Sequence, residues 1–168
     1  MNTVYNPITM PMSPVNMMPN NNFYQNHQVY PDYIKLIAEA ATSEKNDELF
    51  YDYLISIAPT EQDKQIIRDI RNDEKKHNIM FKQLYVELTG SAPAPQTNNQ
   101  DEFEKPKSFC DGIKKALFGE LQAVDKYQRI LSELRNIKHV NMLIEIITDE
   151  LKHSSKYNYL YSTNCVNK

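Results

Sequence analysis

The sequence is poor in glycine and cysteine, two residue types that several classes of protein require. Glycine occurs only three times in 168 residues. A turn-rich β protein would need more, so the composition favours an all-α fold. The two cysteines, Cys110 and Cys165, form no CxxC pair, which argues against a disulfide framework or a zinc ribbon and is compatible with a reducing cytoplasm. We interpret both as ordinary thiols near helix ends.

Long apolar runs and an excess of positive charge are also missing. No stretch approaches the ~20 apolar residues of a membrane span, and the N-terminus lacks the basic start and apolar core of a secretion signal. The net charge is −3, so no electrostatic argument favours nucleic acid or an anionic membrane as a partner. These absences predict a cytoplasmic protein without nucleic-acid or membrane partners.

Helical periodicity fills most of the chain after an irregular N-terminal segment. Residues 1–30 are rich in Asn, Pro and Met and show no period. We interpret them as a flexible tail, with a segment that docks on a partner as the alternative. Apolar residues then recur at spacings of three and four. They predict helices over about 32–58, 61–88, 107–134 and 137–161, within a domain of residues 31–162 that is followed by a tail of residues 163–168.

Local signals mark where the second predicted helix begins and ends. Thr60 with Asp63 three residues later forms a variant of the capping box, and Gly90 is a C-terminal stop. A Pro- and Asn-rich stretch then separates the first pair of helices from the second. Two helical hairpins joined by a long crossover are the connectivity of ferritin-like four-helix bundles.

The second half of the chain repeats the first at an offset of 76 residues. The segment "DEKKH" begins at Asp73, and "DELKH" begins at Asp149. The same offset relates Glu44 to Glu120 and several apolar positions to one another. A repeat that spans a whole hairpin predicts a bundle with pseudo-two-fold symmetry.

Each predicted helix carries a glutamate in the middle of its apolar stripe. Glu44 and Glu74 are equally far from the turn at Pro59, and Glu120 and Glu150 are equally far from the turn at Arg135. Because the rise per residue is constant in a helix, the four glutamates should lie in one layer. His77 and His153 each follow a glutamate by three residues, so they project from the same helix faces.

Four buried carboxylates repel one another unless protons or cations neutralise them. The apolar stripes contain no Arg or Lys, so bound cations are the favoured explanation. Two divalent ions would match four glutamates, and two neutral imidazoles would complete the coordination. A ligand set rich in oxygen, with some nitrogen and no thiolate, favours iron or manganese, with zinc as a possible mimic.

The two ExxH pairs, with one more glutamate on each partner helix, resemble the ligand pattern of the ferritin-like di-iron carboxylate proteins. "GELQAVDKY" (119–127) resembles the third helix of rubrerythrins and bacterioferritins. The resemblance covers about residues 32–161 and implies that Glu74 and Glu150 bridge the metals. It implies six metal ligands, of which the four glutamates are also catalytic: Glu44, Glu74, His77, Glu120, Glu150 and His153.

The same resemblance implies partners for these ligands. Asp73 and Asp149 would accept the second ring N–H of the histidines. Tyr51 and Tyr127 would donate hydrogen bonds to ligand carboxylates, with ordinary core packing as an equal alternative. The remaining histidines, His27 and His139, are interpreted as loop or surface residues. Surface charge is the interpretation for four other glutamates: Glu39, Glu48, Glu133 and Glu145.

The resemblance implies a di-iron oxidoreductase that reacts with O2 or H2O2, takes electrons from a separate donor and forms a homodimer. Its role would be that of an oxidase, peroxidase or ferroxidase in oxidative stress or iron handling. The four-cysteine rubredoxin module of full-length rubrerythrins is absent, and Ala123 stands where rubrerythrin peroxidases carry an extra glutamate. The site is therefore closer to the bacterioferritin type. The alternative is a metal-stapled structural or interaction module, for example in a spore or envelope layer, without turnover.

Overall fold

All regular secondary structure in the described residues is α-helical. The computed structural model describes residues 31–42, 44–94 and 104–166, and of residues 44–47 it describes only the backbone. The predicted N-terminal tail lies outside these ranges. The helices are α1 (Asp32–Thr42), α2 (Glu44–Ile57), α3 (Glu61–Thr89), α4 (Phe109–Glu133) and α5 (Ile137–Asn164). The expected all-α class is confirmed.

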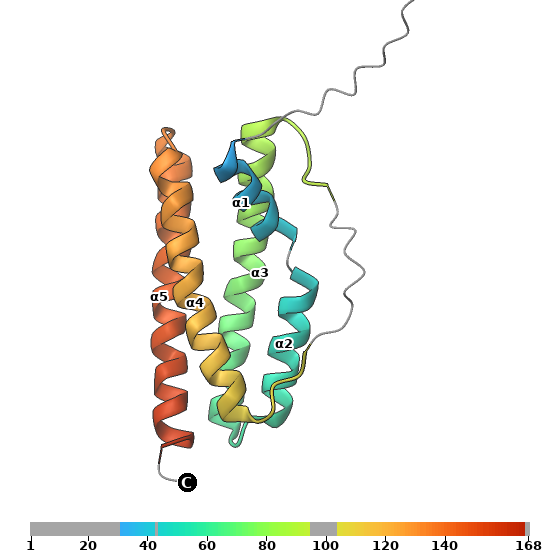
Figure 1. Cartoon of the computed structure of the whole chain (residues 1–168), viewed down its shortest axis with the longest axis vertical. Helices are drawn as coiled ribbons and strands as arrows, with labels where there is room; N and C mark the ends of the chain where they lie inside the picture. The colour runs from blue at the N-terminus through green and yellow to red at the C-terminus, as the bar shows by residue number, and fades with distance from the viewer. Residues whose placement is uncertain (1–30, 43, 95–103, 167–168) are drawn as a thin grey trace, which may run out of the picture.

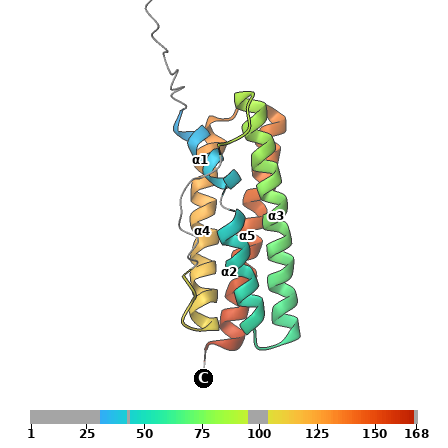
Figure 2. The same cartoon turned by 90° about the vertical axis from the view of Figure 1, so that its right-hand side faces the viewer.

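The helices form a four-helix bundle in which α1 and α2 share the first position. Figure 1 shows both along α3, with α4 and α5 side by side as a second hairpin. The sequence predicted one helix over 32–58, whereas α1 and α2 are separate and do not share an axis in either view (Figures 1 and 2). The sequence of residues 43–48 contains no apolar side chain, so the apolar stripe of the predicted helix is interrupted there.

The ends of α3 follow the signals in the sequence. The hydroxyl of Thr60 accepts a hydrogen bond from the backbone N–H of Asp63 at 3.1 Å. Such an N-cap contributes about 1 kcal/mol. Gly90 has φ 76°, and its N–H donates to the carbonyl of Val86 at 2.8 Å. This left-handed conformation strains residues that carry a Cβ, which is why glycine stands there.

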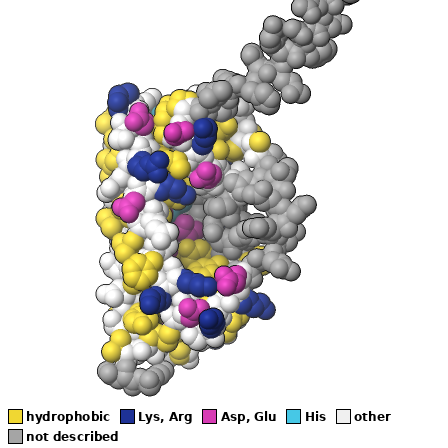
Figure 3. All heavy atoms as spheres, viewed as in Figure 1, with side chains coloured by type: hydrophobic (Ala, Val, Ile, Leu, Met, Phe, Trp, Pro, Cys, Tyr) yellow, Lys and Arg dark blue, Asp and Glu magenta, His cyan; other side chains and the backbone are white. Residues whose placement is uncertain are grey.

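Two apolar clusters fill the bundle, one towards each end. One includes Ile37, Leu84 and Leu143, and the other includes Leu54, Ile67 and Leu160. All six side chains are fully buried. The described residues contain no helix long and apolar enough to span a membrane. On the face seen in Figure 3, acidic and basic side chains are interspersed.

Cys110 and Cys165 are joined by a disulfide, so their interpretation as ordinary thiols was wrong. Cys110 lies in the first turn of α4, and Cys165 directly follows α5. Because the two helices are antiparallel and similar in length, these ends meet, with 5.7 Å between the Cα atoms. The bridge closes the open end of the α4–α5 hairpin.

His139 is buried, so its interpretation as a surface residue was also wrong. Its Nε2 lies 2.8 Å from Oε2 of Glu87, near the end of α3. Lys138 donates to Oε1 of the same carboxylate at 2.7 Å. Hydrogen bonds from Lys138, Gln83 and His139 lower the pKa of Glu87 to about 2. The start of α5 is thus tied to the end of α3 by a contact between hairpins.

We expect opposite effects on stability from alanine at the two glycines of α4. A Cβ at Gly112 would overlap Leu54 and lie 3.2 Å from Pro106, whereas a Cβ at Gly119 would meet nothing within 4 Å. Gly112→Ala should lower the free energy of unfolding by about 1–3 kcal/mol through overpacking. Gly119→Ala should raise it by up to about 1 kcal/mol through helix propensity. Urea unfolding of the two variants measures both, and a gain for Gly112→Ala would contradict the close packing of α2 on α4.

Candidate metal centre

A layer of carboxylate and imidazole groups separates the two apolar clusters. The structure brings together five of the six side chains that the sequence singled out: Glu74 and His77 from α3, Glu120 from α4, and Glu150 and His153 from α5. Four of them are almost fully buried, and Glu74 keeps 22% of its side chain exposed. Glu44 lies at the start of α2, but its side chain is outside the described residues.

The distances around the two histidines repeat in pairs, as the 76-residue offset predicts. His77 Nδ1 lies 3.2 Å from Glu150 Oε1 and 3.7 Å from Glu74 Oε2. His153 Nδ1 lies 3.0 Å from Glu74 Oε1 and 3.8 Å from Glu150 Oε2. Each of these two glutamates therefore turns one oxygen towards each histidine. The imidazole ring centroids are 5.8 Å apart.

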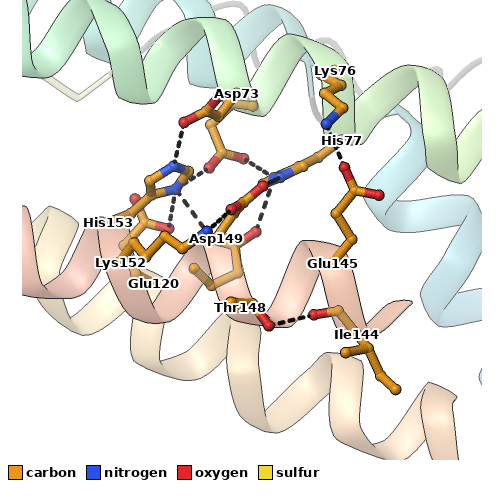
Figure 4. Close-up of polar contacts among 12 residues, drawn as sticks. Asp73, Lys76, His77, Glu120, Ile144, Glu145, Thr148, Asp149, Lys152 and His153 are labelled. Carbon is orange, nitrogen blue, oxygen red and sulfur yellow. Dashed lines mark hydrogen bonds and ion pairs between the residues drawn. The ribbon is translucent and has the colours of Figure 1, made fainter. Parts of the chain in front are cut away.

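An aspartate from the opposite helix holds the outer nitrogen of each histidine. His77 Nε2 lies 3.3 Å from Asp149, and His153 Nε2 lies 3.1 Å from Asp73. Figure 4 shows these contacts crossing between α3 and α5. Because a carboxylate accepts hydrogen bonds, each Nε2–H donates, and each Nδ1 faces the glutamates. The predicted role of Asp73 and Asp149 as histidine partners is confirmed.

Tyrosines surround the carboxylates on the side of α2 and α4. Tyr51 donates a hydrogen bond to Glu120 at 3.4 Å, as predicted, and Tyr127 packs on Phe81 with ring centroids 4.8 Å apart. Sequence reasoning did not single out Tyr157, which is fully buried. Burial, and then the charges of Glu120 and Glu74, raise the pKa of the Tyr157 hydroxyl well above its ordinary value. The sequence signal that could have identified it is a tyrosine within the apolar stripe of the helix predicted over 137–161.

Burial and neighbouring charges strongly shift the pKa values of the ionisable side chains in the layer. Burial and the adjacent carboxylates raise the pKa of Glu120 well above its ordinary value. Burial alone would lower the pKa of both histidines and raise that of Glu150. The contacts between them outweigh burial, so the pKa of Glu150 falls to about 2, that of His77 rises to about 10 and that of His153 rises to about 9. Without metal, protons neutralise much of the negative charge.

Four buried atoms that face the middle of the layer make no well-aligned hydrogen bond: Glu74 Oε1, Glu150 Oε1, His77 Nδ1 and His153 Nδ1. They lie close to one another, with His153 Nδ1 3.0 Å from Glu74 Oε1 and His77 Nδ1 3.2 Å from Glu150 Oε1. Buried polar groups without aligned hydrogen bonds cost about 1–3 kcal/mol each, so a further partner is expected. Ligand atoms of Glu74, Glu120, Glu150 and His153 lie within 4.8 Å of one another. These carboxylate oxygens and imidazole nitrogens are the ligand types that bind a divalent cation such as iron or manganese.

Comparisons with known proteins agree with this arrangement. The Rubrerythrin family model matches residues 35–161. The uncharacterized protein YhjR of Bacillus subtilis is 28% identical over 129 residues, which cover 77% of this chain and 86% of that protein. A hypothetical protein from Pyrococcus furiosus has a similar structure, with a TM-score of 0.66 and 20% identity, and the match covers 77% of this chain and 88% of the other. At that identity the likeness concerns the fold alone.

Proposed function

Because this chain belongs to the rubrerythrin family, we propose that it binds two iron ions, or manganese, and uses them to react with O2 or H2O2. The observation that supports this most is the convergence of buried carboxylate oxygens and imidazole nitrogens that make no well-aligned hydrogen bond. Bound iron would supply the redox chemistry. Electrons would come from a separate donor, and the protein would act as a homodimer. The cytoplasmic location predicted from the sequence loses one of its grounds, because Cys110 and Cys165 form a disulfide, a bond that is rare in a reducing compartment.

The ligands divide into two related groups. Glu120 and His153 would hold one ion, and His77 would hold the other together with Glu44, the predicted sixth ligand. Glu74 and Glu150 would bridge the two ions, because their two oxygens face different histidines.

The residues around the ligands would fix their geometry. Asp73 and Asp149 hold the Nε2–H tautomer of the histidines, which leaves Nδ1 free for a metal. Tyr51 orients the carboxylate of Glu120. The apolar clusters on both sides shield the layer from water along the bundle axis, which strengthens electrostatic interactions within it.

A metal-stapled structural or interaction module without turnover is the second candidate. Described ligands come from both hairpins, three of the helices in all, so an ion would tie the halves of the bundle together even without chemistry. This candidate predicts metal binding and stabilisation without consumption of an oxidant.

Anaerobic titration with Fe(II), followed by O2 or H2O2, tests the proposal. We expect binding near two ions per chain, then growth of a ferric absorption band and loss of the oxidant. The Glu74→Ala, Glu150→Ala double variant should not bind the ions, form the ferric band or consume the oxidant. Glu145→Ala is the matched control, because Glu145 lies on α5 and pairs with Lys76 outside the layer. Equal behaviour of wild type and double variant would refute metal binding at this site, and binding without oxidant loss would favour the structural module.

Metal binding should release protons and become stronger as pH rises. The pKa values of His77, about 10, and His153, about 9, leave both imidazoles protonated at neutral pH without metal. A metal must displace the Nδ1 proton from each. With the proton that Glu120 holds because its pKa is raised, at least one proton is released per ion. This corresponds to at least about a tenfold gain in apparent affinity per pH unit between pH 6 and 8. Calorimetry in buffers of different ionisation enthalpy measures the protons released, and a pH-independent affinity would contradict the expectation.

A further inference from the structure

A cavity of about 380 Å³ opens beside the carboxylate layer, between α2 and α4. Its lining includes the exposed Gly119 and the buried carboxylates of Glu120 and Glu150. Ala116 and Ala123 contribute only methyl groups to its wall. The cavity therefore runs from the protein surface to the layer, along the part of α4 with the smallest side chains.

The inner end of the cavity meets a buried carboxylate of the layer. Glu150 is 1% exposed and lines the cavity, and its Oε1 lies 3.2 Å from His77 Nδ1 without a well-aligned hydrogen bond. Glu120, also on the lining, accepts only a long hydrogen bond from Tyr51, at 3.4 Å. A small molecule that enters from the surface thus reaches the same carboxylates that would hold the metal ions.

Lysines are the only charged side chains on the lining apart from the glutamates of the layer, among the described residues. They are Lys115 and Lys126. Lys126 Nζ lies 5.4 Å from the centre of the Tyr127 ring, and Lys115 Nζ lies 3.7 Å from the highly exposed Glu104. Two divalent ions would balance the charge of four glutamates. Lys126 then leaves the lining of the loaded cavity positive, and Lys115 adds to this only in part because it pairs with Glu104; a positive lining favours an anion.

We propose that this cavity is the binding position and access route by which a small, singly charged anion reaches the metal ions. The inference rests on the proposed function, because the anion would bind through the metal ions of the layer. It assigns Gly119 the role of keeping the route open, and it assigns Lys115 and Lys126 the role of attracting the anion.

Azide is the probe, and its charge-transfer absorption on the iron-loaded, oxidised protein is the measurement. Gly119→Leu should block the route without disturbing the core, because a Cβ there meets nothing within 4 Å. We expect azide to bind at least about tenfold more weakly while iron stoichiometry stays unchanged. Gly119→Ala and Gln122→Leu are the controls, and both should stay within about twofold of wild type. Gln122 lies on the same helix but does not line this cavity.

The Lys115→Gln, Lys126→Gln double variant tests the charge independently of any packing change. It should weaken azide binding several-fold and flatten its dependence on salt. Equal azide affinity in wild type, Gly119→Leu and the lysine variant, or no azide band on iron-loaded wild type, would overturn this inference alone. Failure of the wild type to bind iron would overturn the proposed function and this inference together.

Discussion

Glu120→Gln is expected to stabilise the metal-free protein. Burial and neighbouring carboxylates raise the pKa of Glu120, so the folded state binds its proton more tightly than the unfolded state. Stability then falls as pH rises above about 4.5, the unfolded value. The amide removes this loss and still accepts from Tyr51. At pH 7 we expect a gain of about 1–4 kcal/mol, the range seen when buried charges are replaced by neutral groups. The gain should vanish below about pH 4.

The same variant should lose most of the stabilisation that metal gives. In wild type, Mn(II) or anaerobic Fe(II) at about 1,000 times its dissociation constant should add about 4 kcal/mol for each ion bound. For 168 residues, each ion corresponds to a rise in melting temperature of roughly 10 °C. Differential scanning calorimetry with and without metal, at pH 4 and pH 7, measures both effects.

A glutamate outside the layer provides the control for both effects of Glu120→Gln, on the metal-free protein and on its response to metal. Glu145→Gln removes a carboxylate that is half-exposed and pairs with Lys76. It should change the unfolding free energy by less than about 1 kcal/mol and keep the full response to metal. If Glu120→Gln destabilised the metal-free protein and kept its response to metal, the layer would be a structural hydrogen-bond network instead of a metal site.

Reduction of the Cys110–Cys165 bridge is the other change with a large expected effect. The bridge spans 55 residues, and the chain-entropy relation for a loop of this length gives a loss of about 4 kcal/mol on reduction. Guanidinium unfolding with and without a thiol reductant measures it. Metal stoichiometry at neutral pH should not change, because the bridge joins helix ends and the ligands lie in mid-helix.

The Cys110→Ser, Cys165→Ser double variant provides the control for reduction. It should have the stability of the reduced wild type and should not respond to reductant. Equal unfolding midpoints for oxidised and reduced wild type would show that the bridge contributes nothing to stability.

The sequence was most informative where positions repeat. The 76-residue offset and the constant rise of a helix placed Glu74, Glu120 and Glu150 in one layer, and the structure brings their ligand atoms together with those of His153. The family resemblance also predicted the aspartate partners of the histidines. The roles of Glu74, Glu120, Glu150 and His153 as metal ligands stay a prediction, as does that of Glu44.

Contacts at helix ends were the part that the sequence could not provide. Cys110 and Cys165 meet only because α4 and α5 have similar lengths, and His139 is buried only because α3 ends beside it. Such contacts depend on how far each helix extends, and helix ends are the least reliable part of sequence prediction. The separation of α1 from α2 had a compositional signal, the six polar residues from Ser43 to Glu48.

The described ligand atoms are divided between the two halves of the chain, two side chains from α3 and three from α4 and α5. Neither hairpin alone contains a complete set for either ion in the proposed centre. The iron content of a sample would then measure how many chains have their two hairpins packed together. A chain whose hairpins separate would release its ions.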